Sequence, residues 1–254
     1  MRENTLRSMA AHSASPQSAA GRELAQYFDR LLLRHGAQKW WPARTRLEVI
    51  LGAILTQNTS WKNVTLALTE LRKRRLIHVQ RLRNLGAREL ESLIRSAGFY
   101  RQKTAAILGF LNWLHLRHRG SLRVMFQTPS QRLRHDLLRL RGVGPETADA
   151  ILLYAGGHPY FVADAYTRRL LVRHGWVTST ATYEQVQDFL HRNLPLDPIL
   201  FNEFHALIVE VGKLHCRRQQ PICRGCVLQP FLHEESSAAR PSAPAFDPVV
   251  AGKA

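Results

Sequence analysis

The feature that most constrains this chain is a helical spacing of apolar residues, which recurs from residue 24 to residue 214. Almost no segment shows the alternating pattern that is typical of strands. Helix-start signals accompany the spacing: Ser60, a Thr182-x-x-Gln185 capping box, and Asp197 followed by Pro198. The pattern predicts an all-α fold of about ten helices, with apolar stripes around residues 24–32, 47–55, 61–71, 90–94, 107–114 and 133–140.

Positive charge is concentrated in the part of the chain that should fold. There are 36 Lys plus Arg against 19 Asp plus Glu, a net charge of +17. Residues 1–22 carry a net +2 and residues 233–254 a net −1, which leaves +16 for residues 23–232. Such a body is typical of a protein that binds a polyanion, most often nucleic acid. An RNA partner, a membrane surface and a simple solubility effect are the alternatives.

The two ends have the composition of unfolded segments, and several protein classes can be excluded. Residues 1–22 and 233–254 are rich in Ala and Ser, with Pro in the tail, which predicts a disordered leader and a disordered tail. The presence of only three cysteines argues against a disulfide scaffold. The chain has no run of about 18 apolar residues, which argues against a membrane span. The leader lacks the apolar stretch of a secretory signal. We therefore expect an intracellular, cytoplasmic protein.

The most informative stretch is Gly142-Val143-Gly144, between a helix ending near Leu140 and another opening at Pro145. Glycines allow positive φ and a close backbone approach. Amides beside a helix N-terminus favour a phosphate oxygen, and Val143 is expected to pack between the helices. An ordinary helix–helix turn is the alternative, because Gly-x-Gly alone is a weak signal.

An acidic residue follows the hairpin about 20 residues later. Asp164 emerges from the apolar segment 161–163 and starts a helix that contains Arg168 and Arg169. An aspartate in this position is either a helix N-cap or a functional carboxylate. Spacing alone does not decide between the two.

The hairpin and Asp164 together resemble the helix-hairpin-helix glycosylase motif of the endonuclease III superfamily of DNA repair enzymes. Three further segments match in order: 51–59, which contains Gln57; 97–103; and Cys216-x6-Cys223-x2-Cys226. The resemblance covers roughly residues 23–232. It implies a two-lobed helical fold, in which residues 23–45 plus 156–232 form one lobe with a cysteine-rich loop at 216–226. Residues 46–155 would form a central helical barrel that ends in the hairpin.

The resemblance also implies a reaction. A monomeric enzyme would bind double-stranded DNA in the cleft between its lobes, flip out a damaged base and hydrolyse its N-glycosidic bond. Asp164 would stabilise the cationic sugar and orient or deprotonate the attacking water. Gln57 would fill the hole left by the base, and Phe99 would act as a wedge. A polar turn residue at Gln57 and a core aromatic at Phe99 are the alternatives.

One position departs from the bifunctional members of the superfamily. They carry a Schiff-base lysine two residues after the second hairpin glycine, where this chain has Glu146. A carboxylate cannot be that nucleophile. We therefore expect a monofunctional glycosylase with weak or absent lyase activity, unless Lys103 or Lys213 replaces the lysine in space.

A longer match narrows the resemblance to the 3-methyladenine DNA glycosylase branch. Residues 145–152 carry it, together with Trp40-Trp41-Pro42 and residues 55–59. Trp40 and Trp41 would stack on a cationic alkylated purine, although both could instead pack between the lobes. An endonuclease III type of glycosylase and lyase for another lesion, and a non-catalytic DNA-binding protein, are the other functions considered.

The cysteine spacing resembles the start of the superfamily's iron–sulfur loop. A 4Fe–4S cluster uses four ligands, and the fourth cysteine would fall at position 232, which is Leu232. His233, His215 or a non-protein group could complete the set, and zinc with three Cys and one His is another candidate. Loss of the metal is the remaining alternative.

Overall fold

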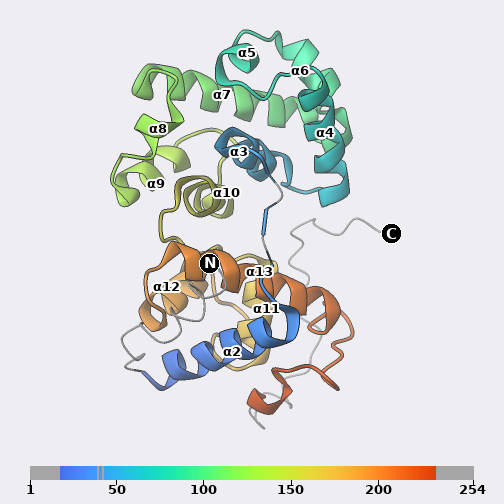
Figure 1. Ribbon diagram of the computed structural model, residues 1–254, viewed down its shortest axis with the longest axis vertical. Helices are drawn as coiled ribbons and strands as arrows, with labels where there is room; N and C mark the ends of the chain where they lie inside the picture. Colours follow the sequence, from blue (N-terminus) through green and yellow to red (C-terminus); the bar gives the residue numbers. More distant parts are fainter. Residues whose placement is uncertain (1–17, 39, 42, 233–254) are drawn as a thin grey trace. The chain divides into compact units, whose positions relative to one another are not determined.

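The computed structural model describes residues 18–38, 40–41 and 43–232 (Figure 1). Over these residues it contains twelve α-helices, three short turns of other helix types and no strand, so the predicted all-α fold is confirmed. None of the described helices has the length and apolar character needed to cross a membrane. Most of the expected leader and the tail after Leu232 lie outside the described residues. Helix α2 begins at Ala19, inside the leader expected over residues 1–22, with Ser18 as its N-cap.

The chain divides into two compact units. The first contains the described residues up to Trp40 and those from Pro159 onward, and the second contains Trp41–His158. The boundaries expected at 45/46 and 155/156 differ from these by a few residues, and the assignment of the two lobes stays a prediction. The sequence signals missed the two shortest α-helices, Val79–Arg83 and Leu122–Met125.

The first unit is built on α13, whose apolar side packs against α2 and α11. The predicted start signals are confirmed: Asp197 caps α13 through the amides of Ile199 and Leu200, and the Thr182 capping box starts α12. Large side chains fill the centre because each removes substantial apolar area from water, at roughly 25 cal/mol per Å². The helices of this unit are α2 (Ala19–His35), α11 (Ala165–Arg173), α12 (Tyr183–Asn193), α13 (Pro198–Leu214) and η3 (Gln229–Phe231). The fully buried aromatic side chains are Tyr27, Phe161, Phe201 and Phe204.

The second unit surrounds α3, in which every residue after the first is buried. The long helix α7 packs against α3, α5, α6 and α8 (Figure 1). Helix α10 continues into a π-helical turn, η2, which also packs on α3. The helices are α3 (Arg46–Leu55), α4 (Trp61–Lys73), α5 (Val79–Arg83), α6 (Ala87–Leu93), η1 (Arg95–Ala97), α7 (Tyr100–His118), α8 (Leu122–Met125), α9 (Ser130–Leu138), α10 (Pro145–Ala150) and η2 (Ile151–Gly156).

Candidate functional site

The hairpin between α9 and α10 needs its first glycine for two reasons. Gly142 has φ +84°, and a Cβ atom there would lie 2.9 Å from the Cβ of Ala106 on α7. Gly144 instead has φ −91° and serves as the N-cap of α10, so only the first glycine uses the positive φ that both permit. Val143 is buried, as predicted for a residue that packs between the helices. The turn is therefore shaped by its packing on α7 as well as by backbone freedom.

A buried ion pair fixes the two hairpin helices to each other. The Arg134 guanidinium on α9 donates to both carboxylate oxygens of Asp149 on α10, at 2.7 and 3.0 Å. The Asp149 side chain is fully buried and that of Arg134 is 19% exposed. A two-point contact of this kind restricts both distance and angle between the helices. It therefore holds the Gly142–Gly144 turn in one geometry.

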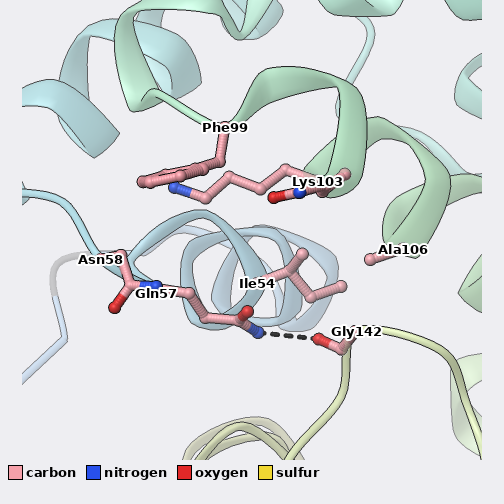
Figure 2. A pocket seen from close by; sticks show the side chains of 8 residues that line it. Ile54, Gln57, Asn58, Phe99, Lys103, Ala106 and Gly142 are labelled. Carbon is pink, nitrogen blue, oxygen red and sulfur yellow. Dashed lines mark hydrogen bonds between the residues drawn. The ribbon is translucent and has the colours of Figure 1, made fainter. Parts of the chain in front are cut away.

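Gln57 connects the loop after α3 to this hairpin. Its Nε2 donates to the carbonyl of Gly142 at 2.8 Å and to Oγ1 of Thr147 at 2.9 Å. Gln57 and Gly142 both line a crevice of about 60 Å³, and Figure 2 shows the first of these bonds along one side of it. Both amide hydrogens are used within the protein, which leaves Oε1 as the amide atom available to accept from another molecule.

Phe99 lies on the opposite side of the same crevice (Figure 2). Its side chain is 57% exposed, so a core role for Phe99 is excluded. Its φ is +44° and follows a φ of +66° at Gly98, while Asn58 across the crevice has φ +53°. A bulky residue rarely adopts positive φ, and such strain collects at functional positions. The backbone thus holds Phe99 outward at some cost in energy.

Lys103 lies beneath Phe99 and is 4% exposed. Its Nζ donates to the carbonyls of Leu55 at 2.9 Å and Ala97 at 2.7 Å, which fastens α7 to the ends of α3 and η1. Burial lowers the pKa of Lys103 to about 8. An ammonium enclosed by two carbonyls is poorly placed to attack a sugar. Lys213, the other lysine considered for that role, is exposed, with its ammonium 5.5 Å from the centre of the Trp40 ring.

Asp164 belongs to the first unit and caps α11. Its Oδ1 accepts from the Thr167 amide at 2.8 Å, and its Oδ2 lies 3.4 Å from Nε2 of His205. The Asp164 side chain is 15% exposed. Burial raises the pKa of this carboxyl, but the electrostatic attraction of the nearby His205 and the hydrogen bonds from Thr167 outweigh burial, so the pKa is lowered. The N-cap interpretation is confirmed, and the low pKa favours the charged form of the carboxyl.

The tryptophan pair belongs to two different units. Trp40, in the first, meets the edge of His205 at 5.8 Å between ring centres. Trp41, in the second, stacks on Tyr154 at 5.0 Å and meets Trp61 edge-on at 5.3 Å. Each ring therefore packs inside its own unit, and a role in base binding stays a prediction. Pro42 of the same motif lies outside the described residues.

The cysteine loop does not have the donor set of a four-thiolate cluster. Leu232 occupies the fourth position, and the described residues contain no group of three or more metal-ligating side chains arranged around one point. Cys216 Sγ instead lies 3.2 Å from Nη1 of Arg173, which also bonds the Arg217 carbonyl. His215 Nδ1 lies 3.1 Å from the Ile222 carbonyl, and His233 is outside the described residues. The cluster stays a prediction that iron and sulfide analysis would test.

The sequence did not predict the part that several residues play in these sites. His205 gives no local signal, because its contact with Asp164 arises where α11 packs on α13. Thr147 and Tyr154 lie on helix positions that look like ordinary core. Asn58 and Trp41 also have positive φ. Asparagine adopts this region more readily than other non-glycine residues, whereas the tryptophan type gives no such signal.

Comparison with known proteins places these features in a family. A model of the HhH-GPD superfamily of base excision DNA repair proteins matches residues 51–196. A protein of Methanocaldococcus jannaschii named "Putative DNA repair glycosylase MJ1434" is 42% identical over 79% of this chain and 91% of its own length. Endonuclease III of Thermotoga maritima is 30% identical over 71% of this chain and 79% of its own length.

Solved structures show the same architecture. The 3-methyladenine DNA glycosylase of H. pylori bound to 1,N6-ethenoadenine has a TM-score of 0.67 and 26% identity, over 77% of this chain and 97% of that chain. A trapped endonuclease III–DNA covalent intermediate has a TM-score of 0.72 over 86% of this chain and 97% of that chain. At 22% identity, the second likeness concerns the fold alone.

Proposed function

Since the chain belongs to the HhH-GPD superfamily of base excision DNA repair proteins, we propose that it is a monofunctional DNA N-glycosylase that removes an alkylated purine such as 3-methyladenine. The observation that carries the proposal is Asp164, a largely buried carboxylate whose pKa lies below its ordinary value of 3.8. An acid held in its charged form can stabilise positive charge that develops on a sugar. The proposed substrate is intracellular duplex DNA, bound by a monomer.

The proposed reaction balances without a further reactant. The N-glycosidic bond breaks with its electron pair going to the base, which neutralises the positive charge of an alkylated purine. Water supplies the oxygen that bonds to the sugar carbon, and its proton passes to Asp164 or to solvent. A cationic base leaves without being protonated, so the site needs no separate general acid. Asp164 therefore has to hold a negative charge near the sugar and orient one water.

The DNA-binding part of the proposal uses the second unit. The amides around Gly142–Gly144 would bind a backbone phosphate, as the N-terminal ends of helices favour anions. Gln57 would meet the unpaired base with Oε1, since both of its amide hydrogens are used by Gly142 and Thr147. Phe99 would separate neighbouring bases. Trp40 and Trp41 would supply aromatic faces for a cationic purine.

Absence of lyase chemistry is a direct prediction. Glu146 replaces the nucleophilic lysine, and Lys103 is enclosed by two carbonyls. We expect no covalent protein–DNA adduct when the protein, lesion DNA and borohydride are incubated together, and strand cleavage only after alkali. A trapped adduct that disappears in Lys213→Ala would contradict the prediction and identify the nucleophile.

A second prediction concerns Phe99. Because its side chain is 57% exposed, Phe99→Ala should leave the melting temperature almost unchanged. It should lower the extent of base flipping, measured with a fluorescent adenine analogue next to the lesion, and slow base release about tenfold, a loss on the order of 1.4 kcal/mol. Phe99→Leu, which keeps an apolar wedge, is the matched control. Equal flipping in the alanine and wild-type proteins would exclude the wedge role.

One panel separates the candidate functions. Duplexes containing 3-methyladenine, 1,N6-ethenoadenine, an oxidised pyrimidine or a G·T mismatch are scored for base release with and without alkali. We expect release of 3-methyladenine, which is cationic, with nicking only after alkali, and slower release of the uncharged 1,N6-ethenoadenine. Release of the oxidised pyrimidine together with spontaneous nicking would favour the endonuclease III type of activity, whose name the T. maritima relative carries. Binding to every duplex without release would indicate a non-catalytic protein.

A further inference from the structure

The proposed mechanism so far leaves out the imidazole of His205, which lies beside the Asp164 carboxyl. We infer that His205 is a positioning residue that fixes the orientation of the Asp164 carboxylate and stabilises its negative charge for base release. The inference rests on the proposed function, because it assigns His205 a part in the work of Asp164. His205 itself is too buried to touch DNA, since only 4% of the residue is exposed.

The surroundings of His205 hold its ring in one orientation. The residue lies in the middle of α13, a 17-residue helix that packs on α11. Trp40 and Phe161 meet the imidazole edge-on, with ring centres at 5.8 and 6.1 Å and planes at 73° and 72°. With the ring held by two aromatic neighbours, Nε2 lies 3.4 Å from Oδ2 of Asp164. A histidine that served only to fill the core would not need a nitrogen placed there.

The carboxyl of Asp164 is consequently held at both oxygens. The Thr167 amide bonds Oδ1 at 2.8 Å, and His205 lies next to Oδ2. The two contacts come from different helices, so together they resist rotation of the carboxyl about its own bond. A small displacement of a reacting group lowers the reaction rate strongly. The amide at the start of α11 would remain if His205 were lost, but one oxygen would lose its partner.

His205 also affects the charge state of the Asp164 carboxyl. Burial raises the pKa of the Asp164 carboxyl, and the electrostatic attraction of His205, whose Nε2 lies 3.4 Å from Oδ2, then lowers it, helped by Thr167. Without the imidazole, burial would be opposed by Thr167 alone. Burial raises the pKa of the neighbouring Tyr166, and the negative charge of Asp164 raises it further. The other titratable and charged groups near these residues are Arg169 on α11, against the Tyr166 ring; His191 on α12, stacked on Phe201; Glu203 on α13, which accepts from the Gln38 amide; and Lys213 on α13, against the Trp40 ring.

The first test does not depend on catalysis. The carboxyl carbon of Asp164 is titrated by NMR in the wild-type protein, in His205→Leu and in His205→Gln. We expect the midpoint to rise by about 1–3 pH units in the leucine variant, the contribution typical of an opposite charge within ~4–6 Å. The glutamine variant keeps a neutral donor and should give a smaller rise. If the leucine variant does not fold, the glutamine variant and the wild-type protein still provide the comparison.

The second test measures base release in a single turnover between pH 5 and pH 8. His205→Leu should release base about tenfold to a hundredfold more slowly at pH 7, with unchanged DNA affinity. Its rate should also fall toward pH 5, where the wild-type rate is expected to stay level. His205→Gln should recover part of the rate. His174→Leu is the matched control, because His174 is buried at the other end of α11 and lies 2.7 Å from the Tyr27 hydroxyl.

The outcomes distinguish the inference from the proposed function. An Asp164 midpoint that does not move in His205→Leu overturns the inference, as does an equal change of rate and midpoint in His174→Leu. A loss of melting temperature with an unchanged pH profile also overturns it, since that would be a purely structural role. A wild-type protein that releases no base, with the midpoint shift present, would overturn the proposed function instead.

Discussion

Replacing Asp164 by asparagine should abolish base release and leave DNA affinity within a few-fold. Asparagine can still accept from the Thr167 amide and is itself a good N-cap, so α11 should keep its start. What is lost is the negative charge that would stabilise the cationic sugar and orient water. We expect the single-turnover rate on alkylated-purine DNA to fall by about 10²–10⁴-fold or below detection.

The matched control for this change is Asp197→Asn. Asp197 caps α13 in the same unit, where its Oδ1 accepts from Ile199 at 2.6 Å and Leu200 at 3.2 Å. The chemical change is identical, but Asp197 has no proposed part in the reaction, so activity should persist. Full activity in Asp164→Asn, or equal losses in both variants, would contradict the assignment of Asp164 as the catalytic carboxylate.

Breaking the Arg134–Asp149 pair should give the largest change in stability. Asp149→Ala leaves the Arg134 guanidinium, 19% exposed, without the carboxylate that it contacts at two points. Loss of one partner from a buried pair costs about 3–5 kcal/mol. For a protein of this size that corresponds to a fall of roughly 6–20 °C in melting temperature, measured by calorimetry or circular dichroism. DNA binding should weaken too, because the pair fixes the angle of the hairpin helices.

Asp136→Ala provides the comparison, because Asp136 lies on α9, the helix that carries Arg134. Asp136 pairs with Arg132 at 3.2 Å, with side chains 24% and 66% exposed. Exposed pairs contribute at most about 1 kcal/mol, so this variant should melt within a few degrees of the wild-type protein. The double variant Arg134→Ala, Asp149→Ala should lose less than the two single losses added together. Strict additivity would mean that the two side chains do not act as a pair.

The sequence predicted well what depends on neighbouring residues. The helical spacing, the Asp197 and Thr182 caps and the burial of Val143 all appear in the structure. The spacing and the caps act within about one helical turn, where residue type and spacing specify the geometry. The resemblance of the hairpin, Asp164 and three further segments to the endonuclease III superfamily also predicted the family. Gly144 shows the limit, because a glycine permits positive φ without requiring it.

The tertiary structure decided which side chains work together. Gln57 and Gly142 are 85 positions apart, and their bond exists because α3 and the hairpin meet in one unit. Phe99 could have been core or wedge by sequence, and packing of the helices around α7 left it outside. By sequence Lys103 was a candidate nucleophile, but in the structure its ammonium donates to two backbone carbonyls.

By itself, then, the sequence determined the helices, their caps, the hairpin and the position of Asp164 after it. Only the tertiary structure placed His205 against Asp164 and Arg134 against Asp149. The physical reason is range. Backbone propensities and caps act over a few residues, whereas charges and rings pair according to how separate helices pack, and many sequences with the same local pattern would pack those side chains differently.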